Sequence, residues 1–72
     1  MKLRPIASNM TEVEIKGATI LFSYETPVAC RSLNNYYRTE QKWSQTTSRH
    51  INKWLNGKTA ELKPQEFFNN LV

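Results

Sequence analysis

A chain of 72 residues with a single cysteine has to be held together by one apolar core. Cys30 has no second cysteine for a disulfide, and one cysteine with one histidine is too few for a Cys-based zinc site. Apolar residues make up 39% of the chain and charged residues 22%, which is typical of a folded domain and not of a disordered one. We therefore expect residues 1–72 to form one small domain without a metal ion or a cofactor.

The first half of the chain predicts an antiparallel meander of three to four strands. Short runs that alternate polar and apolar residues, or that are rich in aromatic and β-branched residues, are separated by turn residues. The expected strands cover residues 12–15, 18–24, 27–31 and 36–39, with turns at Lys16-Gly17 and at residues 32–35. Because Pro27 has no N–H to donate to a neighbouring strand, we expect the third strand to begin at Pro27 or to run along an edge of the sheet.

The second half predicts two helices. Ser44, Thr46 or Thr47 is suited to cap a helix that runs to about Asn56, where Gly57 provides a natural stop. Helical periodicity gathers one stripe for the core, consisting of Thr47, Ile51, Trp54 and Leu55. The opposite stripe is polar and basic and consists of Gln45, Thr46, Arg49, Lys53 and Asn56, joined by Lys42 if the helix begins earlier, while Trp43 and His50 lie on the border.

A shorter helix is expected at the C-terminal end of the chain. Pro64 suits the first turn of a helix, and the residues after it are rich in large apolar side chains. Phe67, Phe68, Leu71 and Val72 would then face the sheet. The complete prediction is an α+β fold of the order ββββαα, with both helices packed on one face of the sheet.

Residues 36–55 are rich in side chains of the types that commonly bind partners. This stretch holds two of the three tyrosines, both tryptophans, the histidine and four of the ten basic residues. Between residues 31 and 58 there are six basic residues against Glu40 alone, so this region has a net charge of +5. The rest of the chain has a net charge of −1, which gives +4 for the whole. Such asymmetry favours an acidic partner. We predict that Arg38, Lys42, Arg49 and Lys53 make electrostatic contacts around a centre of Tyr37, Trp43 and His50.

Catalysis is not expected from these residue types. His50 is the one histidine that could act as a general base, and Cys30 lies in an apolar strand beside Val28, as a buried packing residue does. Residues 56–59 end like a phosphate-binding loop, but Asn52 stands where that motif needs its first glycine, and a helix precedes it instead of a strand. We therefore predict a protein that is not an enzyme.

No stretch of the sequence predicts a membrane segment or a secretion signal. The longest apolar run is Ile20-Leu21-Phe22, and the first residues lack the apolar core of a signal peptide. We expect a soluble, cytoplasmic protein without a membrane partner.

Several strings of residues resemble a small, uncharacterised family of tailed-phage proteins known as a domain of unknown function. These strings are LFSYETPVA, YYRTE, TTSRHINKWL and KPQEFF, and the resemblance covers nearly the whole chain. The resemblance implies a phage or prophage origin and expression in the cytoplasm of a bacterial host. It also implies an accessory role, because small phage proteins of this kind commonly bind a host protein, a defence protein or nucleic acid.

Two binding functions remain open at this point. The favoured one is the binding and modulation of a host or anti-phage defence protein, since Tyr, Trp and Arg are enriched at interaction hot spots. The alternative is a small DNA- or RNA-binding regulator, in which Arg49 and Lys53 contact phosphates and aromatic side chains stack on unpaired bases. An edge strand at residues 27–31 would in addition let two copies pair as a homodimer.

Overall fold

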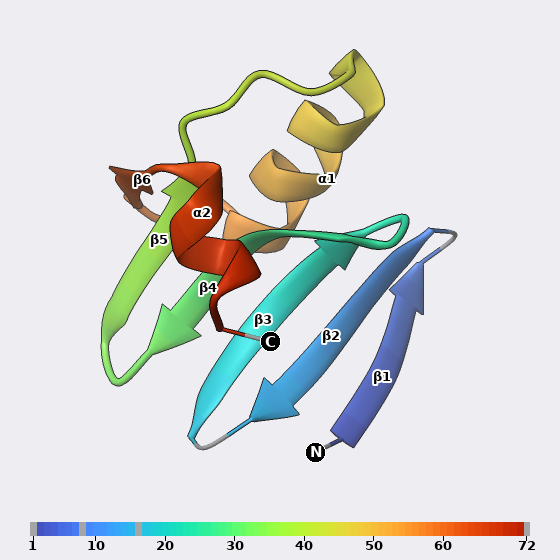
Figure 1. Ribbon diagram of the computed structural model, residues 1–72. Helices are drawn as coiled ribbons and strands as arrows, with labels where there is room; N and C mark the ends of the chain where they lie inside the picture. The colour runs from blue at the N-terminus through green and yellow to red at the C-terminus, as the bar shows by residue number, and fades with distance from the viewer. Residues whose placement is uncertain (1, 8, 16, 72) are drawn as a thin grey trace.

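The computed structural model describes residues 2–7, 9–15 and 17–71, and within them the chain forms six strands and two helices. This confirms the α+β class (Figure 1). The strands are β1 (Lys2–Ala7), β2 (Met10–Ile15), β3 (Ala18–Ser23), β4 (Thr26–Ser32), β5 (Asn35–Thr39) and β6 (Glu61–Lys63). The helices are α1 (Gln45–Leu55) and α2 (Gln65–Asn69). The expected roles of Lys16 in a turn and of Val72 in the core lie outside the described residues.

The six strands form one mixed sheet in the order β1-β2-β3-β4-β5-β6. Strands β1 to β5 pair antiparallel with their neighbours, as the predicted meander requires, and β6 pairs parallel with β5. The sequence prediction missed β1 and β6. Both lie at the edges of the sheet, so the four predicted strands are its interior.

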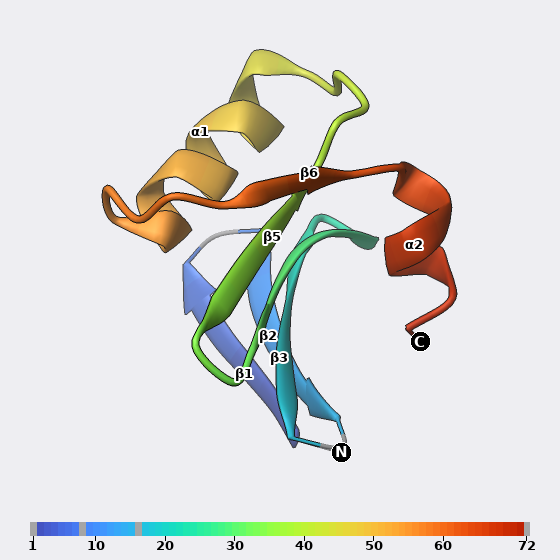
Figure 2. The same ribbon diagram turned by 90° about the vertical axis from the view of Figure 1, so that its left-hand side faces the viewer.

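The two helices lie on opposite faces of the sheet, which corrects the prediction that both pack on one face. Figure 2 shows α1 and α2 on either side of the strands. The pairing register places Leu21, Ala29 and Arg38 side by side on the face that α1 covers. It places Ile20, Cys30 and Tyr37 on the other face, under α2. Because successive residues of a strand point to opposite faces, each central strand supplies both layers of core.

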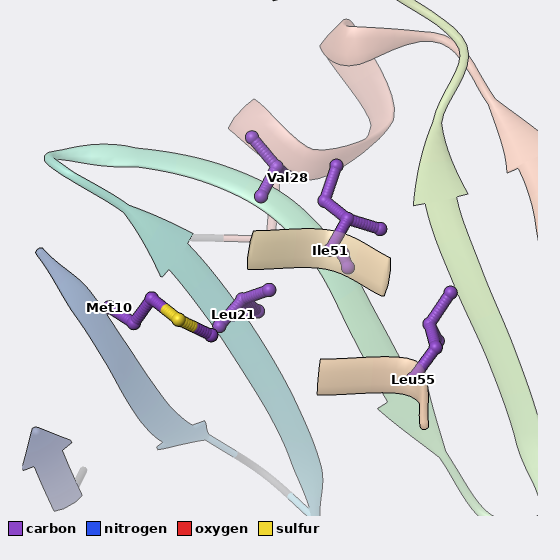
Figure 3. Packing of buried hydrophobic residues seen from close by; sticks show 6 residues of the cluster. Met10, Leu21, Val28, Ile51 and Leu55 are labelled. Carbon is purple, nitrogen blue, oxygen red and sulfur yellow. The ribbon is translucent and has the colours of Figure 1, made fainter. Parts of the chain in front are cut away.

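The larger core cluster lies between α1 and the sheet (Figure 3). Ile51 and Leu55 project from α1 toward the strands, one helical turn apart. They pack with Met10 of β2, Leu21 of β3, and Val28 and Ala29 of β4. Thr47 is buried as well, which confirms the predicted core stripe of this helix, with Trp54 half-buried at its border.

The smaller core cluster lies between α2 and the opposite face. Phe68 is fully buried against Ile20 and Cys30, and Phe67 and Leu71 pack at its margin. The prediction that these three residues of the C-terminal segment face the sheet is thus confirmed. Burial of Cys30 confirms its role as a packing residue, and desolvation raises the pKa of its thiol above the ordinary value.

Strand β4 begins at Thr26, beside Pro27, as the first of the two expectations required, but it is an interior strand, so the alternative of an edge strand at residues 27–31 is wrong. It pairs with β3 on one side and with β5 on the other. The sheet tolerates Pro27 because the register of β3 and β4 shifts between Leu21 and Phe22, beside the proline. Proline is accommodated within sheets at such irregularities, where a ladder hydrogen bond is already missing.

Helix α1 has the boundaries that its capping residues predict. Ser44 is the N-cap, and its hydroxyl accepts a hydrogen bond from the backbone N–H of Thr47 at 3.2 Å. Asn56 ends the helix in the left-handed conformation and Gly57 follows with φ of 84°. Neither helix of the described residues is long and apolar enough to cross a membrane.

Candidate functional site

The structure separates the seven predicted site residues into four places. Arg38, Lys42 and Trp43 line one groove beside α1. Arg49 and Lys53 are exposed on the outer face of α1. His50 lies on the side of α1 that faces β3, and Tyr37 lies on the opposite face of the sheet, against Phe67 of α2. The predicted residues therefore do not form one continuous site.

The groove that three of them line is a mainly apolar hollow beside α1. We call it the α1–β6 groove and define it by Arg38, Lys42, Trp43, Ser48, Ile51 and Leu62. Its volume is about 730 Å³, which is in the range of binding sites for small molecules and for side chains of a partner. Ile51 is buried and forms part of the floor, whereas the side chain of Leu62 remains 58% exposed and that of Trp43 40% exposed.

Local hydrogen bonds hold the loop that closes one end of this groove. The backbone N–H of Gln41 donates to the hydroxyl of Thr39 at 3.1 Å, and that of Glu40 donates to the carbonyl of Lys63 at 2.9 Å. The indole N–H of Trp43 donates to the side-chain carbonyl of Gln65 at 3.1 Å. The loop between β5 and α1 is thus tied to β6 and to the start of α2.

Gln65 links the groove to the interior of the sheet. Its amide nitrogen donates to the carbonyl of Pro27 at 2.7 Å, at the irregular end of β4, and lies 3.1 Å from the side-chain oxygen of Asn69. Gln65 therefore holds both Trp43 and the end of β4. Gln65 was not predicted as a site residue, because no local pattern distinguishes it from any other polar residue at the start of a helix.

The rim of the groove is mainly cationic. Arg38 donates to the side-chain oxygen of Asn52 on α1 at 3.1 Å, which uses one of the five N–H groups of its guanidinium. Lys42 also lines the groove and is exposed, and Glu40 is the acidic residue among the groove-lining side chains. Two basic groups against one acidic group leave the groove with a local charge of +1. An apolar floor with such a rim suits a ligand that is both apolar and anionic.

His50 takes part in a contact between α1 and the sheet. Its Nδ1 lies 2.8 Å from Ser23 Oγ, and Ser23 Oγ lies 3.1 Å from the hydroxyl of Thr47. The ring of Tyr24 lies 5.9 Å from the ring of His50, centre to centre. A serine beside a histidine is also found in hydrolases, but Ser23 is 2% exposed and its hydroxyl is shielded from any substrate. These contacts fix the position of α1.

Tyr37 belongs to an aromatic cluster beneath α2. Lys63 Nζ lies 5.8 Å from the centre of the Tyr37 ring and 5.7 Å from that of Phe67. The same ammonium lies 2.7 Å from a carboxylate oxygen of Glu61. This hydrogen bond and the charge of Glu61 raise the pKa of Lys63 above its ordinary value. Tyr37 is half-buried by these neighbours, so it contributes to packing on the face away from the groove.

A second hollow of about 770 Å³ lies near the turn between β4 and β5, where Arg31, Tyr36 and Lys58 line it together with Glu14. It is more polar than the α1–β6 groove, and Lys58 Nζ lies over the ring of Tyr36 at 5.9 Å.

Among the residues that the structure describes, no group of three or more His, Cys, Asp or Glu side chains is arranged to hold a metal ion.

Comparison with known proteins identifies the family of this chain. A family of unknown function, DUF8033, matches residues 1–70, so the chain belongs to that family. No curated protein and no solved structure matches the chain significantly.

Proposed function

We propose that this DUF8033 protein is a non-enzymatic, phage-type accessory protein that binds and modulates a host or anti-phage defence protein through the α1–β6 groove. The observation that carries the proposal is the pair of large apolar side chains, Trp43 and Leu62, that stay exposed over an apolar floor. The resemblance of the sequence to tailed-phage proteins supports a partner in the host. The proposal includes action in the cytoplasm of a bacterial host cell.

Exposed apolar side chains are costly in so small a protein. Its 72 residues have few large apolar side chains with which to build two core clusters, yet Leu62 contributes to neither. A contiguous apolar surface with a polar rim marks an interaction site more often than chance exposure does. Trp43 and Arg38 are also of the residue types that dominate the energetics of protein interfaces.

A site-directed crosslink tests this proposal. Leu62 is replaced by a photoreactive phenylalanine analogue, and the protein is irradiated in the host cell. The control carries the same analogue in place of Leu33, which is 86% exposed in the turn between β4 and β5. We expect one host protein to crosslink from position 62 and not from position 33. Equal crosslinking from both positions, or none from position 62, would contradict the proposal.

A second candidate function is supported by the outer face of α1. Arg49 and Lys53 are exposed one helical turn apart, and neither forms an ion pair with another residue that the structure describes. Such a pair can contact successive phosphates of a nucleic acid. This stripe holds two basic side chains, and the guanidinium of Arg38 beside it already donates to Asn52. We therefore rank nucleic-acid binding second.

The charge reversal of Arg49→Glu with Lys53→Glu separates the two functions. Both side chains are exposed, so the fold is expected to remain intact. If the protein reads nucleic acid, it binds labelled DNA or RNA at about 50 mM salt, loses affinity steeply at about 200 mM, and loses it altogether in the double variant. We expect only weak binding at low salt, and crosslinking from position 62 unchanged in the double variant.

A further inference from the structure

We infer that the α1–β6 groove receives an extended segment of a partner protein, rich in apolar and acidic residues, which pairs with the outer edge of β6. This inference rests on the proposed function and specifies the kind of partner segment. Extended peptides commonly add a strand to an exposed sheet edge, where main-chain hydrogen bonds supply affinity and pockets for alternate side chains supply specificity.

Of the two edge strands that the structure describes, β1 and β6, the second is the better suited to such pairing. Strand β1 carries Arg4 and Pro5, and its register with β2 is irregular between Pro5 and Ala7. A basic residue, a proline and a bulge are the devices that keep an edge strand from pairing. Strand β6, at the other edge, pairs with β5 in a regular register, and Pro64 follows only after its last residue.

The side chains of β6 are arranged to leave the groove side clear of charge. Leu62 is opposite Arg38 in the register, so it lies on the face of the groove. Glu61 and Lys63 are opposite Tyr37 and Thr39 on the other face, where they bond to each other at 2.7 Å. The charged residues that would protect this edge are thereby paired on the far side. Figure 2 shows β6 as the outermost strand, running from the side of α1 to α2.

The chemistry of the occupant follows from the groove itself. A strand added beside β6 points alternate side chains into the groove, next to Leu62 and over the floor at Ile51. Apolar side chains fit there. Residues that flank them reach the rim, where Arg38 and Lys42 favour carboxylates. The expected segment thus contains apolar residues at alternate positions together with Asp or Glu.

A displayed library of random linear peptides, selected on the whole protein, provides the probe. The enriched peptides are synthesised, and their affinities are measured by fluorescence anisotropy against matched variants. Leu62→Glu and Lys42→Glu alter the groove. Leu33→Glu and Lys58→Glu make the same changes at exposed positions outside it. We expect acidic, apolar sequences whose Kd rises at least about tenfold with each groove variant and less than about twofold with its control.

Backbone methylation tests the pairing with β6. N-methyl groups at alternate residues of an enriched peptide remove the donors that a strand needs, and we expect a loss of at least about tenfold in affinity in one of the two alternating patterns. Enrichment of basic sequences, equal effects of groove and control variants, or indifference to both methylation patterns would overturn this inference. A crosslink from position 62 to a folded host protein would then still support the proposed function, so the two can fail separately.

Discussion

Trp54 and Trp43 both donate their indole N–H, but to acceptors of different strength. Trp54 is half-buried and donates to a carboxylate oxygen of Glu12 at 2.6 Å, across from α1 to β2. Trp43 is more exposed and donates to the neutral amide of Gln65 at 3.1 Å. Hydrogen bonds to charged groups contribute roughly twice as much as those between neutral groups. Only the first of these contacts should therefore matter greatly for stability.

The same substitution at the two positions tests this difference. Phenylalanine keeps an aromatic ring and removes the N–H. We expect Trp54→Phe to lower the free energy of unfolding by about 1.5–3 kcal/mol, because Glu12 loses a charge-assisted bond within the structure. Trp43→Phe should cost less than about 1 kcal/mol, because water can replace its contact with Gln65. Urea denaturation followed by circular dichroism measures both. Equal losses in the free energy of unfolding would mean that the bond to Glu12 contributes no more to stability than the bond to Gln65.

The turns between strands contain residues in an unfavourable backbone conformation. Leu33, in the turn between β4 and β5, has φ of 57°, and Tyr24, between β3 and β4, has φ of 59°. Leucine and tyrosine rarely adopt the left-handed region, where the cost is about 1–2 kcal/mol per residue. The ring of Tyr24 at least contacts His50. Leu33 is 86% exposed, so its side chain offers little packing in return.

Replacing Leu33 by glycine should therefore stabilise the turn. The strain removed is about 1–2 kcal/mol, and the additional backbone entropy that glycine loses on folding is about 0.5–1 kcal/mol. We expect Leu33→Gly to raise the free energy of unfolding by about 0.5–1 kcal/mol, seen as a higher midpoint of thermal denaturation. Tyr24→Gly is the comparison, with a smaller gain because it also removes the contact with His50. A lower midpoint for Leu33→Gly would show that this turn carries no strain.

The elements that sequence reasoning found are those whose signals are local. Helix α1 has a capping serine, an apolar stripe and a terminal Asn-Gly, and each acts within one helical turn of the residues that it organises. Strand β1 was missed because Pro5 is a residue that normally argues against a strand. Strand β6 was missed because its partner β5 ends 22 residues earlier in the chain, and three residues are too few to show a pattern.

The candidate site was predicted in part for the same reason. Arg38, Lys42 and Trp43 were expected to bind, and they do line one groove. Leu62 completes that groove from a strand that no local pattern revealed. Tyr37 differs from Arg38 by one position, yet it faces the opposite side of the sheet, because strand residues alternate between faces. Only the arrangement of the two helices decides which of these faces holds the groove.

One sheet supplies the cores of both layers, so the two layers should unfold together. Leu21 and Ala29 pack under α1, while the adjacent Ile20 and Cys30 pack under α2. A strand cannot leave one layer without leaving the other. A domain of this size also has little stability to spare, since typical values are about 5–15 kcal/mol and small cores lie at the low end.

A cavity beneath α2 should therefore be detected on the face of α1. Phe68 is fully buried, and Phe68→Ala should cost about 3–5 kcal/mol, most of the total stability. In a Trp43→Phe background, the fluorescence of Trp54 reports on the α1 layer and the reaction of Cys30 with a thiol reagent reports on the α2 layer. We expect both signals to shift to the same lower urea midpoint, with a smaller shift for the half-buried Phe67→Ala. If Cys30 became reactive while the Trp54 transition stayed in place, the two layers would be independent units.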